Sequence, residues 1–379
     1  MKLKVCTVFG TRPECIKMAP VVLRLEAAGE VEQTVVVTGQ HREMLDQMLE
    51  IFEITPNHDL EIMEARQSLT RVTVKTLESL EGVLRSVRPD VVLVHGDTTT
   101  SFAGALAAYY SRTPVGHVEA GLRTGDPYNP YPEEMNRRLI DHLSELLLAP
   151  TAGASDALIA ENLDPGKIYV TGNTVVDALL IAVRKARPDP GVPEIPEECR
   201  MILVEAHRRE NWGEPLRGIC EALKEITAAY RDAHVVFPVH LNPVVRETVF
   251  DSLNGAERIH LLEPQSYLSF VHLMNRSYMI LTDSGGIQEE APSLRKPVVV
   301  LRTKTERPEA LEAKTAVLAG TEKRGIVEHV SRLMDDEAGY EEMTRGRNPY
   351  GDGRAAERSV GAVLHRFGVG GGRPDDFAG

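Results

Sequence analysis

Short apolar runs alternate with longer amphipathic stretches along the chain, and this alternation constrains the fold more than any other feature of the sequence. The apolar runs predict strands and the amphipathic stretches predict helices. In the first half the expected elements are 4–9, 14–28, 34–38, 41–51, 69–87, 91–95, 99–110 and 115–119. A repeated strand–helix–strand order is typical of a parallel sheet with helices on both faces, and continuous apolar runs are typical of strands buried on both sides. We therefore expect an α/β fold.

A proline-rich segment interrupts the alternation near the middle of the chain. Residues 187–199 read RPDPGVPEIPEEC, a composition typical of an exposed loop or linker. The alternation then restarts, with strands expected at 201–205, 234–238, 278–282 and 297–301 and a helix at 215–230. A length of 379 residues suits two or three domains of about 150 residues each. We expect two doubly wound, Rossmann-like domains facing a cleft, and a disordered glycine-rich tail at 368–379.

Composition excludes several classes of protein. Hydrophobic residues make up 42% of the chain and charged residues 26%, which is typical of a globular protein. The net charge of −13 opposes binding to nucleic acid, because an acidic surface repels phosphate backbones. No apolar run is long enough to span a membrane and the N-terminus lacks a signal-peptide pattern, so we expect a cytoplasmic protein. Cys6, Cys15, Cys199 and Cys220 form no CxxC pair, so we expect neither a metal site nor a disulfide framework.

Polar residues gather just after several expected strands, which is where a doubly wound sheet binds its ligands. After the first strand, residues 10–17 combine a glycine, a helix that begins near Pro13, and the cations Arg12 and Lys17. A helix N-terminus with free N–H groups and nearby cations is suited to an anion, although a surface turn with solvated charges would look the same. The segment matches neither GxxxxGK(S/T) nor GxGxxG, so it does not indicate a P-loop or a dinucleotide site.

Three carboxylates of the first half are candidates for acid–base chemistry. Asp97 follows the expected strand 91–95, where it can either cap the next helix or take part in a reaction. Glu119 ends the strand 115–119 beside a glycine, and a functional role is favoured because an unpaired buried carboxylate is costly. Glu133 lies in the first turn of a helix, where an acidic residue also interacts favourably with the helix dipole.

The second half has strand ends rich in cations and glycines. His207 and two arginines follow one strand, and Ser284 and the glycine pair 285–286 follow another. Glycines let a diphosphate approach backbone N–H groups closely. Glu290 comes one to two helical turns later, where it can accept hydrogen bonds from a ribose, and Arg307 follows a third strand. The pattern predicts a nucleotide diphosphate held mainly by the second domain, with its other end near the carboxylates of the first.

In these segments the chain resembles the non-hydrolysing UDP-N-acetylglucosamine 2-epimerases of bacteria. The resemblance runs from residue 1 to about residue 366. It rests on segments 9–17, 40–47, 92–100, 116–124, 132–137, 207–211, 238–243, 281–293, 306–309 and 348–353. It implies the two-domain architecture called GT-B, with a first domain at 1–172, a second at 173–352, and a C-terminal helix at 353–367 that crosses back to the first.

The resemblance also implies a reaction, a set of residues and an oligomer. Members interconvert UDP-GlcNAc and UDP-ManNAc, for cell-surface polysaccharide synthesis, by anti elimination of UDP to 2-acetamidoglucal and re-addition with inversion at C2. They use no NAD, metal or other cofactor, and a homodimer is expected. The matching catalytic positions are Asp97, Glu119, Glu133, Arg137 and His207. The matching UDP-binding positions are Arg12, Lys17, His207, Ser284, Gly285, Gly286, Glu290 and Arg307. Some members bind a second UDP-GlcNAc as an activator, at positions that are here Gln40, Arg66, Gln67, Glu133, Arg208 and His240.

Two segments depart from the sequence that is usual in the family. Glu205 stands two residues before His207 where members have threonine, and Thr303-Lys304 stands where members have Asp-Thr. A carboxylate of Glu205 that pointed into the UDP site would repel phosphate, and the alternative is that it pairs with a nearby arginine. These changes bear on substrate affinity and regulation more than on the reaction.

The chemistry explains why such residues are needed. The C2 proton of a sugar is barely acidic, so UDP must depart first or ahead of it, and fixed cations stabilise the leaving diphosphate. The proton leaves to a base on one face and returns from an acid on the other, which needs two carboxylates, or one carboxylate and a water. Three alternatives stay open. They are a hydrolysing epimerase that releases ManNAc and UDP, a GT-B glycosyltransferase with an acceptor site, and a non-catalytic sensor of nucleotide sugars.

Overall fold

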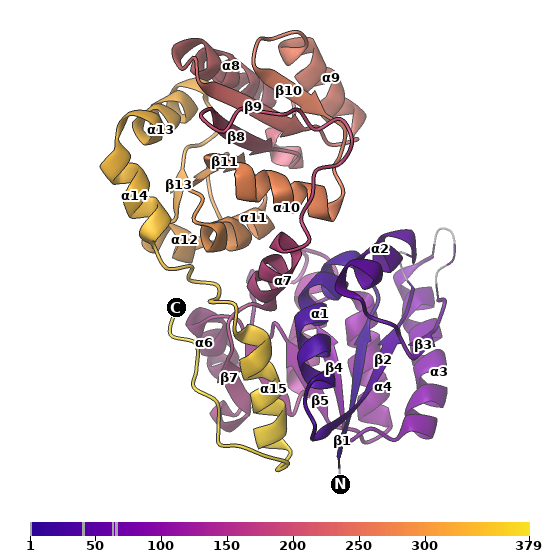
Figure 1. Ribbon diagram of the computed structural model, residues 1–379. Helices are drawn as coiled ribbons and strands as arrows, with labels where there is room; N and C mark the ends of the chain where they lie inside the picture. The colour runs from indigo at the N-terminus through magenta and orange to yellow at the C-terminus, as the bar shows by residue number, and fades with distance from the viewer. Residues whose placement is uncertain (1, 40–41, 63, 65–66) are drawn as a thin grey trace. The chain divides into compact units, whose positions relative to one another are not determined.

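The computed structural model describes residues 2–39, 42–62, 64 and 67–379. The chain forms two compact units, the first of Met1–Ala178 with Tyr350–Gly379 and the second of Leu179–Pro349 (Figure 1). The chain therefore passes into the second unit and returns to the first near its C-terminus. Every helix within the described residues is too short or too polar to cross a membrane.

The described residues of the first unit form one parallel sheet of seven strands. Its strands are β1 (Leu3–Phe9), β2 (Val31–Val37), β3 (His58–Asp59), β4 (Val91–His95), β5 (Val115–Val118), β6 (Leu146–Ala149) and β7 (Ile168–Val170). They lie in the order β3-β2-β1-β4-β5-β6-β7, and Val5 of β1 lies opposite Val91 of β4. The strand order changes direction between β1 and β4, and ligands of doubly wound sheets bind at the carboxyl ends of strands at such a switch point.

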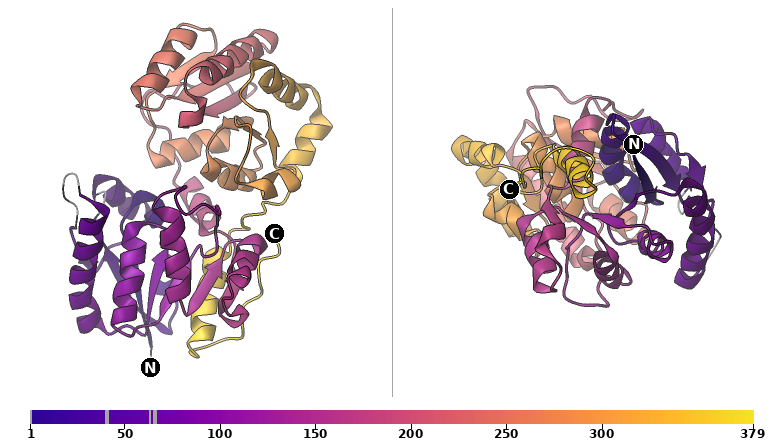
Figure 2. Two further views of the ribbon diagram at one scale, coloured as in Figure 1. Left: turned by 180° about the vertical axis from the view of Figure 1, so that it is seen from behind. Right: turned by 90° about the horizontal axis from the view of Figure 1, so that it is seen from below.

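Helices cover both faces of this sheet. On one face α1 (Arg12–Glu26), α2 (Arg42–Phe52) and α15 (Ala355–Arg366) pack together, and on the other α3 (Leu69–Val87), α4 (Thr99–Tyr110) and α5 (Glu133–Leu143) do so (Figures 1 and 2). The remaining elements of this unit are α6 (Ala152–Ala160), the 3-10 helix η1 (Pro165–Lys167) and the start of α7 (Thr174–Val183).

Local sequence explains how these helices begin and how closely they pack. Thr11 and Glu14 form a capping box at the start of α1, and Thr98 caps α4 by accepting a hydrogen bond from the N–H of Ser101. α4 is rich in small residues, which lets it lie close to the sheet: a Cβ at Gly104 would come within 3.3 Å of Val94 Cγ1. α4 therefore presents its first turn close to the end of β4.

The second unit has a six-stranded parallel sheet in the described residues. Its strands are β8 (Arg200–Glu205), β9 (Ala233–Pro238), β10 (Ile259–Leu262), β11 (Met279–Thr282), β12 (Val298–Val300) and β13 (Ala316–Leu318). They lie in the order β10-β9-β8-β11-β12-β13, with Thr282 at the end of β11 opposite Glu205 at the end of β8. The switch point of this sheet therefore lies between β8 and β11.

The core of the second unit lies between this sheet and its helices. α8 (Glu214–Ala229) packs against α9 (Pro243–Leu253) and α13 (Lys323–Asp335), and α13 packs against α14 (Glu337–Arg345). The other helices are α10 (Tyr267–Arg276), α11 (Gly285–Glu290), α12 (Pro308–Glu312) and the 3-10 helices η2 (Arg209–Asn211) and η3 (Ala291–Leu294). Ile219, Leu223 and Ile226 of α8 are fully buried against strand residues such as Val235 and Phe237.

The division of the chain differs from the expected boundaries. The first unit extends to Ala178, six residues beyond the expected end at 172, and the change of unit falls within α7. The proline-rich segment 187–199 belongs to the second unit, where Asp189 accepts hydrogen bonds from the N–H and hydroxyl of Ser266 at 2.7 and 2.8 Å. It is therefore a loop anchored to the start of α10.

The C-terminal tail differs from the disorder that its composition predicts. Phe377 donates its N–H to the carbonyl of Val170 over 2.7 Å, and Asp376 accepts from the N–H of Val170 over 2.9 Å. The guanidinium of Arg373 lies 4.1 Å from the centre of the Tyr169 ring. The physical reason is that β7 is an edge strand with backbone groups unpaired on one side, and the tail satisfies them.

Candidate active site

Charged side chains gather at the switch point of each sheet. In the first unit they follow β1, β4 and β5, and in the second they follow β8 and β11. These positions are loops at the carboxyl ends of central strands, where a doubly wound fold presents its functional groups. Each unit thus has a cluster of its own.

Glu119 is held by partners from three elements. It follows β5 with a φ of +67°, a backbone conformation that is costly for a residue other than glycine and that is found preferentially at functional sites. Its side chain is 8% exposed and ion-paired with Lys17 of α1. His95 Nε2 lies 3.2 Å from its Oε2, and Asn173 Nδ2 donates to its Oε1 over 2.9 Å. The structure therefore joins two of the predicted residues, Lys17 and Glu119, in one pair.

The environment of Glu119 keeps it ionised. Burial opposes ionisation, but the Lys17 ammonium and the His95 ring outweigh it and hold the pKa of Glu119 well below its usual value. Glu119 is therefore an anion at neutral pH. It can accept a proton or stabilise developing positive charge, but it has no proton of its own to give.

Asp97 is held by the first turns of α5. Its carboxylate is bonded by Arg137 Nη2, and its carbonyl accepts from Asn136 Nδ2 over 2.9 Å. Arg137 Nη1 lies 3.6 Å from the fully buried Glu134, which also accepts the N–H of Thr124 over 3.0 Å. Asp97 and Arg137, each implied separately by the resemblance, are thus in contact, and Glu134 anchors Arg137 to the loop before α5.

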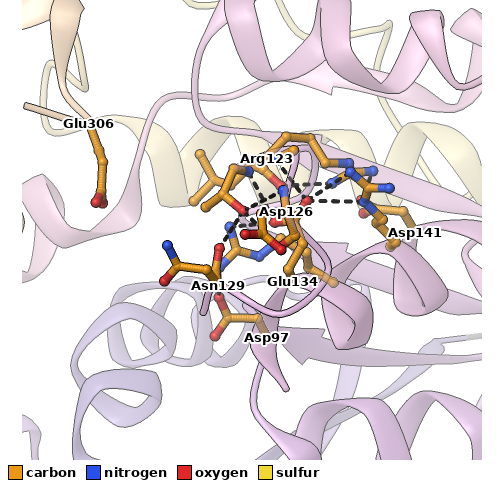
Figure 3. Close-up of polar contacts among 12 residues, drawn as sticks. Asp97, Arg123, Asp126, Asn129, Glu134, Asp141 and Glu306 are labelled. Carbon is orange, nitrogen blue, oxygen red and sulfur yellow. Dashed lines mark hydrogen bonds and ion pairs between the residues drawn. The ribbon is translucent and has the colours of Figure 1, made fainter. Parts of the chain in front are cut away.

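A buried histidine supports the backbone that carries Asp97. His117 of β5 donates its Nε2–H to the carbonyl of Gly96 over 2.7 Å, and its Nδ1 lies 2.6 Å from Asp141. Arg123 lies 2.8 Å from the other Asp141 oxygen, and Figure 3 labels these two residues. Because Gly96 directly precedes Asp97, this chain of contacts restricts where Asp97 can point.

Glu133 contrasts with the two carboxylates above. It begins α5 and is half-buried. Across residues 2–39, 42–62, 64 and 67–379, no hydrogen bond or ion pair of its side chain is found. Of the three predicted carboxylates, Glu133 is therefore the one without a fixed partner.

Two backbone N–H groups just before α1 already have a partner within the protein. Glu14 is 2% exposed, and its carboxylate accepts the N–H groups of Gly10 and Thr11 over 2.9 and 2.7 Å. These donors are therefore used inside the protein, in the capping box of α1. The guanidinium of Arg12 is what this loop offers to an anion.

Asp283 organises the cluster of the second unit. It is fully buried and accepts the N–H groups of His207 and Arg208 over 3.0 and 2.9 Å, and Asn211 Nδ2 over 2.8 Å. Burial raises the pKa of Asp283, and the nearby carboxylate of Glu205 raises it further. Asp283, Glu205 and His207 are of the types that bind metal ions, but this carboxylate is already engaged by N–H donors. We therefore assign no metal to the cluster.

Glu205 takes neither of the two arrangements expected from the sequence. Its Oε1 is bonded to Nδ1 of His207 rather than to an arginine, and its Oε2 accepts from the hydroxyl of Thr282 over 2.8 Å. Both of its oxygens therefore face protein donors.

The predicted diphosphate-binding residues lie together at the start of α11. A Cβ at Gly285 would lie 3.7 Å from the guanidinium of Arg307, and one at Gly286 would lie 3.9 Å from Ser284 Oγ and 4.0 Å from Glu290 Oε1. The N–H of Ser284 is donated to the Thr282 hydroxyl over 2.9 Å and is therefore not held open for a ligand. What this loop presents to a ligand is therefore its side chains and the surface of the glycine pair 285–286.

Comparison with known proteins identifies the family. The model of the family described as UDP-N-acetylglucosamine 2-epimerase matches residues 23–364. The chain belongs to this family. The UDP-N-acetylglucosamine 2-epimerase of Bacillus subtilis is 50% identical over 378 residues, which is 100% of this chain and 99% of that protein.

Solved structures agree on the family and on the fold. The UDP-GlcNAc 2-epimerase of Neisseria meningitidis, crystallised bound to UDP-GlcNAc, matches with a TM-score of 0.85 and 49% identity over 96% of this chain and 100% of that one. A glycotransferase of kitacinnamycin, only 12% identical, matches with a TM-score of 0.66 over 97% and 99% of the two chains. This second likeness shows the fold alone, and with the first it confirms the predicted GT-B-like architecture of two Rossmann-like domains.

The activator positions implied by the 2-epimerase family are only partly described. Gln40 and Arg66 lie outside the described residues. Gln67 Nε2 donates to the carbonyl of Ile62 over 2.6 Å. In the second unit, the His240 ring stacks on that of His207 at 5.3 Å between centroids, and Arg208 directly follows His207. Whether these positions form one site stays a prediction.

Several residues of these two clusters were not singled out from the sequence. One is His95, which contacts Glu119. The others support Asp97 indirectly: Glu134 contacts Arg137, and His117 with Asp141 holds the backbone at Gly96. One signal was available, since His95 and His117 are polar residues within apolar strands. The pairing of His117 with Asp141 had no local signal, because those residues are distant in sequence and meet only through the packing of α5 on the sheet.

Proposed function

We propose that the chain interconverts UDP-GlcNAc and UDP-ManNAc by anti elimination of UDP to 2-acetamidoglucal and re-addition of UDP with inversion at C2. One observation carries the proposal: the switch point of the first sheet holds Asp97 and Glu119, each paired with a cation. The substrate class is supported by the family and by a relative that was crystallised with UDP-GlcNAc.

The carboxylates of the first unit would carry the proton steps. Glu119, being ionised, would act as a base or stabilise the oxocarbenium-like sugar, and its pKa makes it unsuited to be the acid. Asp97 is oriented by Arg137, while Glu133 has the freedom to exchange a proton with substrate or water. Proton transfer by two groups with separated pKa values suits removal of the C2 proton on one face and its return on the other.

The second unit would hold UDP. His207, Arg307 and the glycine pair 285–286 would meet the diphosphate, and Glu290 would accept hydrogen bonds from the ribose. Arg12 and Lys17 stay predicted UDP-binding residues, and Lys17 would act mainly through Glu119. Cations placed in advance at the leaving group lower the barrier to C1–O bond cleavage. Retention of UDP beside the glucal makes re-addition effectively unimolecular. No net oxidation occurs, so the route needs no nicotinamide.

Product analysis separates this function from its rivals. Purified protein is incubated with UDP-GlcNAc, and the nucleotides and sugars are separated by chromatography and identified by proton NMR. We expect UDP-ManNAc with little free UDP. Free ManNAc with stoichiometric UDP would establish a hydrolysing epimerase. Unchanged UDP-GlcNAc would contradict the proposal and favour a glycosyltransferase or a sensor. That the enzyme is a cytoplasmic homodimer activated by a second UDP-GlcNAc stays a prediction.

A further inference from the structure

The carboxylate of Glu205 is fixed at both oxygens at the switch point of the second sheet. Oε1 is bonded to Nδ1 of His207, and Oε2 accepts from the Thr282 hydroxyl over 2.8 Å. The same hydroxyl accepts the N–H of Ser284 over 2.9 Å. The Glu205 side chain is 19% exposed. Glu205 therefore joins the ends of β8 and β11 and has few positions open to it.

The surroundings of His207 leave one ring nitrogen for a ligand. Its Nδ1 is bonded to Glu205 and lies 3.7 Å from Asp283. One face of the ring stacks on His240, with 17° between the planes. Arg208 is the cation beside it along the chain. Within the described part of the chain no hydrogen bond to Nε2 is found, and the side chain is 33% exposed.

These contacts favour a doubly protonated ring. A carboxylate only accepts hydrogen bonds, so Nδ1 carries a proton toward Glu205. The hydrogen bond from Glu205 raises the pKa of His207, burial lowers it, and the charges of Glu205 and Asp283 add to the rise while Arg208 opposes it. The net effect is a pKa above the usual 6.5, so Nε2 keeps its proton further into the neutral range.

We propose that Glu205 is a positioning residue that holds His207 as an imidazolium, with Nδ1–H on Glu205 and Nε2–H presented to the diphosphate of bound UDP. The choice of UDP as ligand rests on the proposed function. The Glu205–His207 pair carries no net charge, and the carboxylate oxygens face Nδ1 and Thr282 rather than a ligand. This explains how a carboxylate can stand beside an anion site without repelling the anion.

The protonation of His207 can be measured without any ligand. Histidine ring signals of the full-length protein are titrated by NMR, and His207→Gln assigns the signal that disappears. We expect His207 to titrate above pH 6.5 in the wild type and at lower pH in Glu205→Gln, which is isosteric. Glu263→Gln, which removes an exposed partner of Arg246, serves as control and should titrate as the wild type. A wild-type His207 that titrates at or below pH 6.5, or identically in Glu205→Gln, would overturn the proposal.

UDP binding tests the second half of the proposal. Dissociation constants for UDP are measured by calorimetry at pH 6 and pH 8. At pH 8 we expect Glu205→Gln to bind UDP about tenfold more weakly than the wild type, because a charge-assisted hydrogen bond is lost. The difference should be smaller at pH 6 than at pH 8, because a larger fraction of its His207 is protonated at the lower pH. Tighter binding by Glu205→Gln at pH 8 would show that Glu205 repels the ligand, and equal binding would show that its bond to His207 does not affect UDP binding; either result would overturn this half of the proposal.

The two proposals fail in different ways. If UDP-GlcNAc is bound but never converted, the proposed reaction is wrong. The NMR titration of His207 and the dissociation constants for UDP still test the role of Glu205 in that case. If Glu205→Gln is destabilised, as judged by circular dichroism, the wild-type titration of His207 alone remains decisive.

Discussion

Glu119 and Asp283 show how the same chemical group acquires opposite properties in this molecule. Glu119 is surrounded by Lys17, His95 and the amide of Asn173, and its pKa is lowered despite burial. Asp283 is surrounded by backbone N–H groups and a second carboxylate, and its pKa is raised by burial and by Glu205. The first is suited to a reaction step, whereas the second is suited to holding loops together.

Replacing Glu119 tests the chemical role of the first-unit cluster. Glu119→Gln keeps the shape of the side chain but removes the charge, so we expect kcat for UDP-ManNAc formation to fall at least about a hundredfold, the usual scale for a general acid or base. Steady-state kinetics with UDP-GlcNAc measure this. Glu263→Gln is the control, and wild-type kcat in Glu119→Gln would remove Glu119 from the mechanism.

The same residue makes stability depend on pH. The pKa of Glu119 is lower in the folded chain than its unfolded value of about 4.3. The ionised Glu119 therefore contributes to the free energy of unfolding above about pH 4.3, and this contribution is lost as pH falls through the folded pKa. The difference in free energy of unfolding between the wild type and Glu119→Gln should therefore be larger at pH 7 than at pH 4. Urea unfolding at both pH values measures it, and a difference that grows on acidification would contradict the ion pair.

At the scale of elements, periodicity predicted several of the long or strongly apolar ones but not all of them, since α13 and β6 were not predicted. The helices 69–87 and 99–110 and the strand 91–95 begin and end where expected. Short strands such as β3, β7 and β13 were not predicted, because two or three residues are too few to show a periodic pattern. At the start of α1 the sequence shows where the helix begins, but not that the Glu14 carboxylate accepts the N–H groups of Gly10 and Thr11.

The last helix depends on a contact that the sequence does not reveal. Asp177 of α7 accepts the N–H groups of Ala355 and Ala356, at 3.1 and 2.9 Å, and so caps α15. We expect Asp177→Ala to lower the free energy of unfolding by about 1–2 kcal/mol, as loss of a helix cap does. Chemical denaturation measures this, with the exposed Asp251→Ala on α9 as control. Equal stability of the two variants would mean that the cap contributes nothing.

At the scale of the whole molecule, the sequence predicted two Rossmann-like units and the return of the chain to the first. It missed where the chain changes unit, because α7 continues through the boundary and composition does not shift there. It also missed the docking of the tail, since glycine-rich composition reports flexibility of the isolated segment and not the unpaired edge of β7. The predicted site residues Asp97 and Glu119 lie where strands end at a switch point. The partners of these residues were missed where they meet only through tertiary packing.

Removal of the tail tests whether it belongs to the folded unit. Deleting residues 368–379 removes two hydrogen bonds with Val170 of β7, one accepted by Asp376 and one donated by Phe377, each worth about 1 kcal/mol. For a unit of this size we expect the Tm to fall by about 2–8 °C, as measured by differential scanning calorimetry. An unchanged Tm would restore the expectation of a disordered tail.

The most direct test of the central claim is the fate of the C2 hydrogen. UDP-GlcNAc is incubated with the protein in heavy water, and both epimers are examined by proton NMR and mass spectrometry. Elimination and re-addition predict that UDP-ManNAc forms with one deuterium at C2, and that deuterium also enters the recovered UDP-GlcNAc as equilibrium is approached. Formation of UDP-ManNAc that keeps its original C2 hydrogen would contradict the account, because the carboxylates would then have no proton to exchange.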